Sequence, residues 1–347
     1  MARNYWLGGL GHLFSFIAFI ARTLSDWIFA VKIAITDYNF PNVEIEEGIL
    51  IPAGHEVVAW KERRPSAELV ELVRDADAVI TQFASVNAEV IASMQLAKVI
   101  VRYGIGVDNV DLLAARSRDI PVCNVPDYCI DEVADHTLAF LLATTRQVVT
   151  NSNLVHAGKW GLATSLDQLR TLRDLTVGVV GFGRIGREVA SRLRAFKCRV
   201  LVHDPVVVDS TIIHLGCVPA SLTQVLADSD VITLHCPSTA NTRGLINRDS
   251  LATTKRGVIV INLARGDLVD SQALSDALQS GQVSNAALDV FAPEPIPGDH
   301  PILKMDNVIL ASHIASASVP AVRKLRETAA GLALTALRGE PLPNVVN

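Results

Sequence analysis

The chain has 347 residues, enough for two domains of ordinary size, and half of its residues are hydrophobic. Lys and Arg number 31 against 36 Asp and Glu, which gives a net charge of −5, and no Lys/Arg-rich run occurs. Nucleic-acid binding is therefore not expected. The five cysteines form no C-x-x-C pair, as expected for reduced thiols of a cytoplasmic protein, and no constellation of metal ligands stands out.

The first 30 residues differ in composition from the rest. Residues 5–20 contain no Asp, Glu, Lys or Arg and are rich in Leu, Ile and Phe. Arg22 and Asp26 interrupt this run before it reaches the ~20 residues that cross a bilayer, and no clean cleavage site follows. Two interpretations stay open: an interfacial helix that touches a membrane, or a non-native extension, with translation starting near Val31.

From Val31 onward, strand and helix patterns alternate, which predicts an α/β fold. The first part has expected strands at 31–36, 57–60, 78–81 and 98–101, and a helix over 66–74 with Ser66 as its N-cap. A long helix is expected over residues 131–150. The later strands are expected at 177–180, 199–202, 231–235, 257–262, 285–290 and 308–312. Helices are expected over 221–226, 270–279 and 319–337, the last ending at Gly339.

A glycine motif of the form G-x-G-x-x-G follows the strand at 177–180. Gly181 permits a tight turn, Gly183 lets the backbone approach a pyrophosphate, and Gly186 lets the next helix pack closely on the strand. The N-terminal N–H groups of that helix suit a diphosphate. Its buried face is expected to carry Ile185, Val189, Leu193 and Phe196.

An acidic residue follows the second strand of this unit. Asp204 lies 18 residues beyond Gly186 (204 − 186), where a carboxylate accepts both hydroxyls of an adenosine ribose. The four residues after it, Pro205 to Val208, include no Arg or Lys that could bind a 2′-phosphate. The pattern therefore predicts a dinucleotide-binding unit and favours NAD over NADP.

Polar residues lie at or just beyond the ends of four later strands, at His235, Arg265, Asp289 and His313. Because ligands bind at the carboxyl ends of parallel strands, we expect these side chains at one ligand-binding edge. Arg265 suits a substrate carboxylate, since its guanidinium is a planar fork. His313 suits acid–base chemistry near neutral pH, and Glu294 could accept a hydrogen bond from its ring and favour its protonated form.

Five motifs occur in order along the chain. They are Val-Arg-Tyr-Gly-Ile-Gly-Val-Asp-Asn-Val-Asp (101–111), Gly-Phe-Gly-Arg-Ile-Gly (181–186), Ile-Asn-Leu-Ala-Arg-Gly-Asp-Leu-Val-Asp (261–270), Ala-Leu-Asp-Val-Phe-Ala-Pro-Glu-Pro (287–295) and Ser-His-Ile-Ala (312–315). With these motifs, the chain from Val31 to Asn347 resembles the D-isomer-specific 2-hydroxyacid dehydrogenase family. The resemblance implies an enzyme that interconverts a D-2-hydroxyacid and its 2-oxoacid with NAD(H).

The resemblance also implies roles for individual residues. Catalysis would fall to Arg265, Glu294 and His313. The backbone N–H groups of Gly104, Ile105 and Gly106, with Arg265, would hold the substrate carboxylate. The residues implied to contact the cofactor are Gly181, Gly183, Arg184, Ile185, Gly186, Asp204, Cys236, Leu263, Ala264, Arg265, Asp289, His313 and Ala315.

The family layout implies two Rossmann-like, doubly wound parallel-sheet domains, with the dinucleotide domain inserted into the substrate domain. The expected boundaries are 31–127 and 316–347 for the substrate domain and 128–315 for the NAD-binding domain, after the extension at 1–30. Family members are usually dimers, so the resemblance also implies a homodimer.

The resemblance leaves the substrate open between those of 3-phosphoglycerate dehydrogenase-like and hydroxypyruvate/glyoxylate reductase-like enzymes. Residues 81–86 contain no arginine, so a phosphate would lose the partner that phosphoglycerate enzymes typically provide there. Residues 122–135 look more like the branch close to the C-terminal-binding-protein corepressors, although residues 316–318 lack the aromatic side chain that those proteins carry. An NAD(H)-sensing binding protein of the corepressor type is therefore the alternative.

Overall fold

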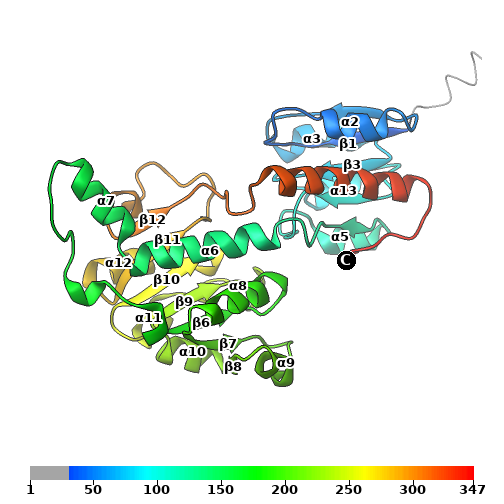
Figure 1. Cartoon of the computed structure of the whole chain (residues 1–347). Coiled ribbons are helices and arrows are strands. Elements are labelled where there is room, and N and C mark those ends of the chain that lie inside the picture. Colours follow the sequence, from blue (N-terminus) through cyan, green and yellow to red (C-terminus); the bar gives the residue numbers. More distant parts are fainter. Residues whose placement is uncertain (1–30) are drawn as a thin grey trace, which may run out of the picture. The chain divides into compact units, whose positions relative to one another are not determined.

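The computed structural model describes residues 31–347, which form two compact units, each built around its own parallel sheet (Figure 1). Unit 1 comprises residues 31–126 and 323–347, and unit 2 comprises residues 127–322. The prediction of two Rossmann-like parallel-sheet α/β units is confirmed. The interpretations of residues 1–30 lie outside the described residues. No helix within residues 31–347 is long and apolar enough to cross a membrane.

Unit 1 has a five-stranded sheet in the order β2-β1-β3-β4-β5, with every pair parallel. Its strands are β1 (Lys32–Ile35), β2 (Glu56–Ala59), β3 (Ala78–Thr81), β4 (Ile100–Arg102) and β5 (Val122–Cys123). Its helices are α2 (Glu44–Leu50), α3 (Ser66–Val73), α4 (Ala88–Ser93), α5 (Leu112–Ser117) and most of α13 (Val319–Leu337). Strands β3 and β4 are buried along their whole length, as expected for inner strands of a parallel sheet covered on both faces.

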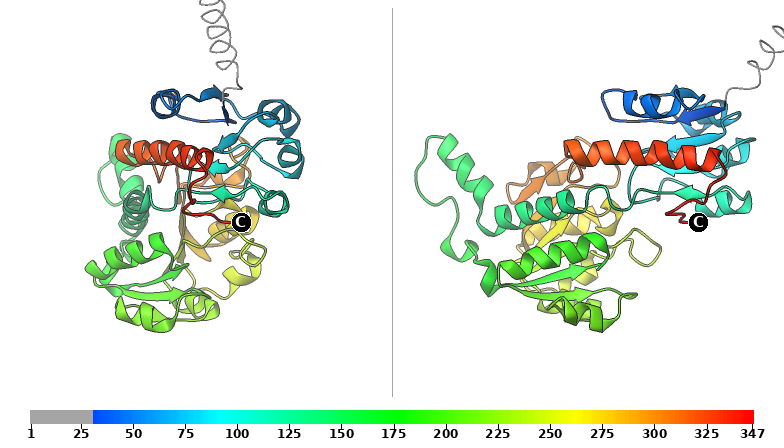
Figure 2. Two further views of the ribbon diagram at one scale, coloured as in Figure 1. Left: turned by 90° about the vertical axis from the view of Figure 1, so that its right-hand side faces the viewer. Right: turned by 45° about the vertical axis from the view of Figure 1, so that its right-hand side comes forward.

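Unit 2 has a seven-stranded parallel sheet in the order β12-β11-β10-β9-β6-β7-β8. Its strands are β6 (Thr176–Val180), β7 (Arg199–His203), β8 (Val218–Pro219), β9 (Val231–Leu234), β10 (Val258–Asn262), β11 (Val283–Leu288) and β12 (Val308–Leu310). Its α-helices are α6 (Ile130–Thr145), α7 (Val148–His156), α8 (Arg184–Ala195), α9 (Asp209–His214), α10 (Leu222–Asp228), α11 (Arg248–Ala252) and α12 (Ser271–Ser280). Helices α6 and α8 pack side by side, whereas α7 stands away from the sheet (Figures 1 and 2).

The strand order of unit 2 reverses between β6 and β9. From β6 the chain adds β7 and β8 on one side, then returns to β9 and builds β10, β11 and β12 on the other. In doubly wound sheets, ligands bind outside the carboxyl ends of the strands at such a reversal. Gly181, after β6, and His235, after β9, lie at this point.

Three expectations about local structure are wrong in detail. The helix expected over 131–150 is two helices, because Gln147 adopts a left-handed conformation, with a φ of 52°, between α6 and α7. Ser66 is the first residue of α3 rather than its N-cap, and its hydroxyl donates to the Ser85 carbonyl. Phe196 follows the last residue of α8 and is 40% exposed, so it lies outside the buried face of that helix.

Candidate active site

The glycine turn after β6 packs directly against the chain that leaves β9. Gly181 has a φ of 94°, and a β-carbon there would lie 2.5 Å from the backbone nitrogen of Cys236. A β-carbon on Gly186 would lie 2.1 Å from the carbonyl oxygen of Gly181, so both positions exclude a side chain. A β-carbon on Gly183 would meet nothing within 4 Å. The turn therefore leaves open space at the one glycine that a pyrophosphate approaches.

Helix α8 starts at once from this turn. Gly183 is its N-cap residue, and no side chain caps its first N–H groups. Arg184 and Ile185, which the resemblance implies as cofactor contacts, form its first turn. The uncapped N–H groups and the positive end of the helix dipole favour an anion, so these residues fit the diphosphate of a dinucleotide.

Asp204 follows β7, and its carboxylate accepts three backbone hydrogen bonds. Oδ2 accepts the Phe182 N–H at 2.7 Å, and Oδ1 accepts those of Val206 at 2.8 Å and Val207 at 3.0 Å. Burial alone would raise the pKa of Asp204, but the hydrogen bonds outweigh it and hold the pKa below its ordinary value. The carboxylate is ionised at neutral pH and can accept hydrogen bonds from ribose hydroxyls.

His313 and Glu294 form a hydrogen-bonded pair. Nδ1 of His313 lies 2.8 Å from Oε2 of Glu294, and Oε1 accepts the Phe291 N–H at 2.9 Å. Burial alone would raise the pKa of Glu294, but His313, the Phe291 N–H and the charge of Arg265 together lower it below its ordinary value. An ionised Glu294 accepts a hydrogen bond from the ring and so orients the imidazole.

Asp289 fixes the backbone that carries the histidine. It is fully buried, and its carboxylate accepts the N–H groups of Ile314 at 2.8 Å and Ala315 at 2.9 Å. Its carbonyl accepts the His313 N–H at 2.7 Å. These bonds hold His313 in the left-handed region, with a φ of 56°, a conformation that costs a non-glycine residue about 1–2 kcal/mol. The hydrogen bonds that Asp289 makes with this segment, including the one to Ala315, thus fix the position of His313.

Arg265 follows β10 at the same edge of the sheet. Its Nη1 donates to the Ala264 carbonyl at 2.7 Å. The side chain of Asn262 ties the turn together, because it donates to the Arg265 carbonyl at 2.8 Å and accepts the Ala264 N–H at 3.0 Å. Leu263 is buried within this turn. Asn262 was not among the residues expected in the site. It is the polar last residue of an otherwise apolar strand, and this feature could have identified it.

Gly266 brings the turn of Arg265 close to the segment that carries Glu294. A β-carbon on Gly266 would lie 2.0 Å from the carbonyl carbon of Phe291, so only glycine permits this approach. Arg265 is near enough for its charge to lower the pKa of Glu294. The three residues expected to be catalytic therefore come together at the carboxyl ends of unit 2 strands.

The two residues after β9 are poor candidates for chemistry. Burial raises the pKa of the Cys236 thiol to about 11, so the thiol is protonated and unreactive at neutral pH. His235 bonds the Thr233 hydroxyl through Nε2 at 2.9 Å, and burial lowers its pKa to about 4. His235 is thus a neutral residue beneath the glycine turn. Across residues 31–347, no group of three or more His, Cys, Asp or Glu could hold a metal ion.

In unit 1, the loop at 104–106 after β4 is held by its carbonyl groups. The Gly104 carbonyl accepts the Val125 N–H at 3.0 Å, and the Ile105 carbonyl accepts a side-chain N–H of Asn124 at 2.6 Å. Across a trans peptide, the carbonyl and the next N–H point in opposite directions, so the N–H groups of Ile105 and Gly106 face away from this support. Neither has a hydrogen-bond partner among the described residues. They form a pair of donors suited to a carboxylate.

The N–H group of Gly104 does not have the role that the resemblance implies, which is to bind the substrate carboxylate. Its own N–H donates to the Arg102 carbonyl at 2.9 Å, so two of the three expected N–H groups remain for a substrate. Asn124, which orients them, was not singled out by the sequence. It directly follows β5, a strand of only two residues, and no strand was expected there, so the rule that singled out His313 could not find it.

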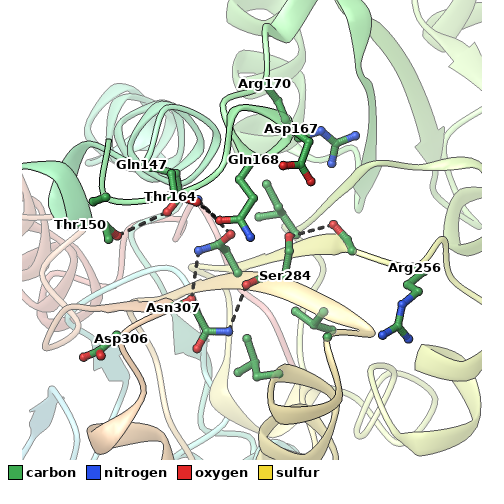
Figure 3. Close-up of a pocket in the computed structure, with 17 residues that line it drawn as sticks. Gln147, Thr150, Thr164, Asp167, Gln168, Arg170, Arg256, Ser284, Asp306 and Asn307 are labelled. Atoms are coloured by element: carbon green, nitrogen blue, oxygen red, sulfur yellow. Dashed lines mark hydrogen bonds between the residues drawn. The ribbon is translucent and has the colours of Figure 1, made fainter. Parts of the chain in front are cut away.

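A pocket of about 660 Å³ lies at the other edge of the unit 2 sheet (Figure 3). Residues at the starts of β10 and β11 line one side, and the segment 147–170 lines the other. Polar groups bond to one another across it, as where Gln147 donates to Asn285 at 3.0 Å. The amino ends of the strands face this pocket, and the three expected catalytic residues do not line it. It is distinct from the candidate active site.

Comparisons with known proteins agree with this geometry. Residues 138–315 match the sequence model of the family described as "D-isomer specific 2-hydroxyacid dehydrogenase, NAD binding domain". Glyoxylate reductase of Korarchaeum cryptofilum is 36% identical over 297 residues, which cover 84% of this chain and 90% of that protein. D-3-phosphoglycerate dehydrogenase of Mycobacterium leprae is 39% identical over 291 residues, 84% of this chain, and the chain spans only 54% of that relative's length.

Solved structures show the same relationship. The TT0316 protein of Thermus thermophilus superposes with a TM-score of 0.81 at 37% identity, covering 91% of this chain and 100% of that one. D-Lactate dehydrogenase of Aquifex aeolicus, solved with NAD and lactic acid, gives a TM-score of 0.80 at 29% identity, covering 89% and 96%. The chain therefore belongs to the D-isomer-specific 2-hydroxyacid dehydrogenase family.

Proposed function

We propose that this protein is an NAD-dependent oxidoreductase that interconverts a D-2-hydroxyacid and its 2-oxoacid. The observation that carries the proposal is the hydrogen bond of 2.8 Å between His313 Nδ1 and Glu294 Oε2. This pair lies at the carboxyl edge of the sheet, where the glycine turn at 181–186 also lies. The glycine turn, the start of α8 and Asp204 would hold NAD, which supplies the hydride acceptor or donor when bound. The enzyme names of the relatives support the same chemistry.

Each residue of the candidate site has one task in this proposal. In reduction, protonated His313 donates its Nε2 proton to the oxygen of the 2-oxoacid; in oxidation, neutral His313 accepts a proton from the hydroxyl. Ionised Glu294 orients the ring, and Asp289 holds its backbone. The guanidinium of Arg265 binds the substrate carboxylate as a fork and polarises the carbonyl.

The two units divide the work in this proposal. Residues 128–315 bind the cofactor and supply Arg265, and residues 31–127 with 316–347 form the substrate domain and supply backbone N–H groups to the substrate. The N–H groups of Ile105 and Gly106 support substrate binding by the second of these domains. They point away from the rest of the loop, and as hydrogen-bond donors they suit a carboxylate and not a cation.

The substrate is tested by following NADH oxidation with glyoxylate, hydroxypyruvate, pyruvate, 2-oxoglutarate and phosphohydroxypyruvate. Glyoxylate and hydroxypyruvate need no phosphate partner, and residues 81–86 contain no arginine. Turnover of phosphohydroxypyruvate above all others would instead assign a phosphoglycerate enzyme. Tight NADH binding without turnover of any 2-oxoacid would contradict the proposal and favour the corepressor-type alternative.

We also propose that the protein is a homodimer that uses the segment 147–170. This segment carries an unusual set of exposed apolar side chains, and Trp160 is 93% exposed. The others are Val148, Val149, Val155, Leu162 and Leu166. Such a patch on a protein surface marks an interface. Trp160→Glu is expected to shift the mass measured by light scattering from dimer to monomer, and an unchanged dimer would contradict this interface.

We further propose a cytoplasmic location. All five cysteines are free in the structure, and four of them are buried. Free thiols are typical of reducing compartments. Fractionation of the native host, with the protein followed by antibody, tests the location.

A further inference from the structure

A buried polar network in unit 1 reaches the residue before the 104–106 loop. Arg326 of α13 donates through Nη2 to Oε2 of Glu46 at 2.6 Å and through Nε to Oε1 at 2.9 Å. The hydroxyl of Tyr103 donates to the same Oε1 at 2.8 Å. Glu46, Arg326 and Tyr103 are 0%, 5% and 1% exposed. Phe40 packs against two members of the network. The centre of its ring lies 4.9 Å from the Arg326 guanidinium carbon and 5.4 Å from the centre of the Tyr103 ring.

We propose that Tyr103, Glu46 and Arg326 are positioning residues that hold the N–H groups of Ile105 and Gly106 in the direction that binds the substrate carboxylate. This inference rests on the function proposed above. The three side chains lie in the interior and act through the backbone of Tyr103, which continues directly into Gly104.

Stability alone gives a weak reason for such a network. A buried ion pair costs so much desolvation that apolar residues of the same volume often serve as well or better. What the pair of Glu46 and Arg326 adds is a fixed acceptor for the Tyr103 hydroxyl. Burial, reinforced by the nearby Glu46, raises the pKa of Tyr103 well above its ordinary value, so the hydroxyl keeps its proton and remains a donor.

Three hydrogen bonds hold Tyr103, and its position determines where the 104–106 loop begins. Its N–H donates to the Thr81 carbonyl at 2.8 Å, and its carbonyl accepts Nη1 of Arg102 at 2.8 Å. The hydroxyl bond to Glu46 is the third. Gly104 then turns with a φ of 145°, so close to Arg102 that a β-carbon would lie 1.4 Å from Nη1. A shift of Tyr103 therefore moves the peptide that precedes the two donor N–H groups.

The experiment compares Tyr103→Phe and Arg326→Lys with the parent and with Thr335→Val. The control removes a hydroxyl bond of 2.9 Å to Gly331, further along α13, and leaves the network intact. Tyr103→Phe is expected to raise the KM for the 2-oxoacid about fivefold, in line with one lost hydrogen bond, with kcat and the NADH Kd little changed. Arg326→Lys keeps the charge but loses the fork, so it should change KM in the same direction. Thr335→Val should match the parent in all three.

A second readout does not depend on turnover. The amide protons of Gly104 and Val125 form hydrogen bonds of the loop frame, so their hydrogen exchange should be faster in Tyr103→Phe than in Thr335→Val. An unchanged KM with unchanged exchange would overturn the inference, as would an equal loss of NADH affinity, because that would indicate general damage. If the parent reduces no 2-oxoacid, the proposed function fails, and the exchange comparison still decides whether the network positions the loop.

Discussion

The two glycine loops of this molecule expose their backbone N–H groups in different ways. In unit 2, the turn at 181–186 runs straight into α8, so its donors are the first N–H groups of a helix. In unit 1, the loop at 104–106 does not enter a helix, since α5 begins only at Leu112 with Asp111 as its cap. There the carbonyls of Gly104 and Ile105 are tied down, and the following N–H groups are turned outward.

The difference suits two sizes of anion. A helix N-terminus offers several converging donors and a dipole, which suits a diphosphate. Two adjacent N–H groups suit the smaller carboxylate. The acid–base side chains His313 and Glu294 lie with the first kind of loop, in unit 2. In the proposed function, unit 2 binds the cofactor and carries proton transfer, and unit 1 contributes backbone donors. The following changes test this division.

The largest effect is expected for His313→Ala. Without the imidazole, the chemical step should slow by about 10²–10⁴-fold, because proton transfer loses its acid and base. The NADH Kd should stay near that of the parent, since the glycine cradle is untouched. Single-turnover kinetics and calorimetric titration separate the two quantities. Near-parental rates would remove His313 from the mechanism.

The glycines offer a direct contrast between the loops. Gly186→Ala forces a β-carbon against the Gly181 carbonyl, and such overpacking costs about 1–3 kcal/mol, so both the Tm and the NADH affinity should fall. Gly183→Ala meets no protein atom within 4 Å and should lower only the NADH affinity. Gly104→Ala should instead raise the KM for the 2-oxoacid. If Gly104→Ala weakened NADH binding most, the division between the units would be wrong.

His235 should make the free energy of unfolding depend on pH. Its pKa falls from 6.5 to about 4 on folding, so between these values the unfolded chain binds a proton that the folded chain does not. The free energy of unfolding should therefore decrease as the pH falls from about 6.5 to about 4, by about 2 kcal/mol between pH 7 and pH 5. Urea unfolding of the parent and of His235→Gln measures this slope, which should be flatter in the variant. Parallel profiles would show that the imidazole does not titrate in this way.

Cofactor choice should follow from Asp204. A 2′-phosphate would meet an ionised carboxylate and find no cation in residues 205–208, so NADH should bind at least tenfold more tightly than NADPH, about 1.4 kcal/mol. Titration calorimetry with both nucleotides tests this, and Asp204→Asn should narrow the gap. Equal affinities in the parent would contradict the role of Asp204.

The smallest effect is expected for Glu294→Gln. The neutral amide is a weaker partner than the ionised carboxylate for a protonated imidazole, so reduction should lose its acid form at a lower pH than in the parent. The measurement is the pH profile of kcat/KM for reduction. An unmoved alkaline limb would leave Glu294 with a purely structural role.

Local patterns were enough to predict much of this molecule. The buried strands, the glycine turn and the polar residues beyond strand ends all follow from signals within a few neighbouring residues. The break of the expected helix at Gln147 could not be predicted, because no glycine or proline marks it. The contacts of Asp289 could not be predicted either. They depend on a tertiary contact between Asp289, just after β11, and Ile314, 25 residues later, which no local pattern records.

The same limit applies to the buried pair of unit 1. Glu46 and Arg326 are 280 positions apart, so neither side chain carries a local sign of the other. Asn124 differs from these cases, because it directly follows a strand, but β5 has only two residues and is too short to show a strand pattern.

That separation has a consequence for the order in which the protein takes shape during synthesis. Unit 2 is one continuous stretch and can fold as soon as residue 322 has left the ribosome. Unit 1 cannot, because Glu46 emerges before unit 2 and its cation, Arg326, emerges only after all of unit 2. Until then the nascent chain must keep a carboxylate hydrated that the finished fold buries completely. Residues 323–347 therefore complete the assembly of unit 1, which leaves residues 31–126 without this part of their fold until the whole of unit 2 has been translated.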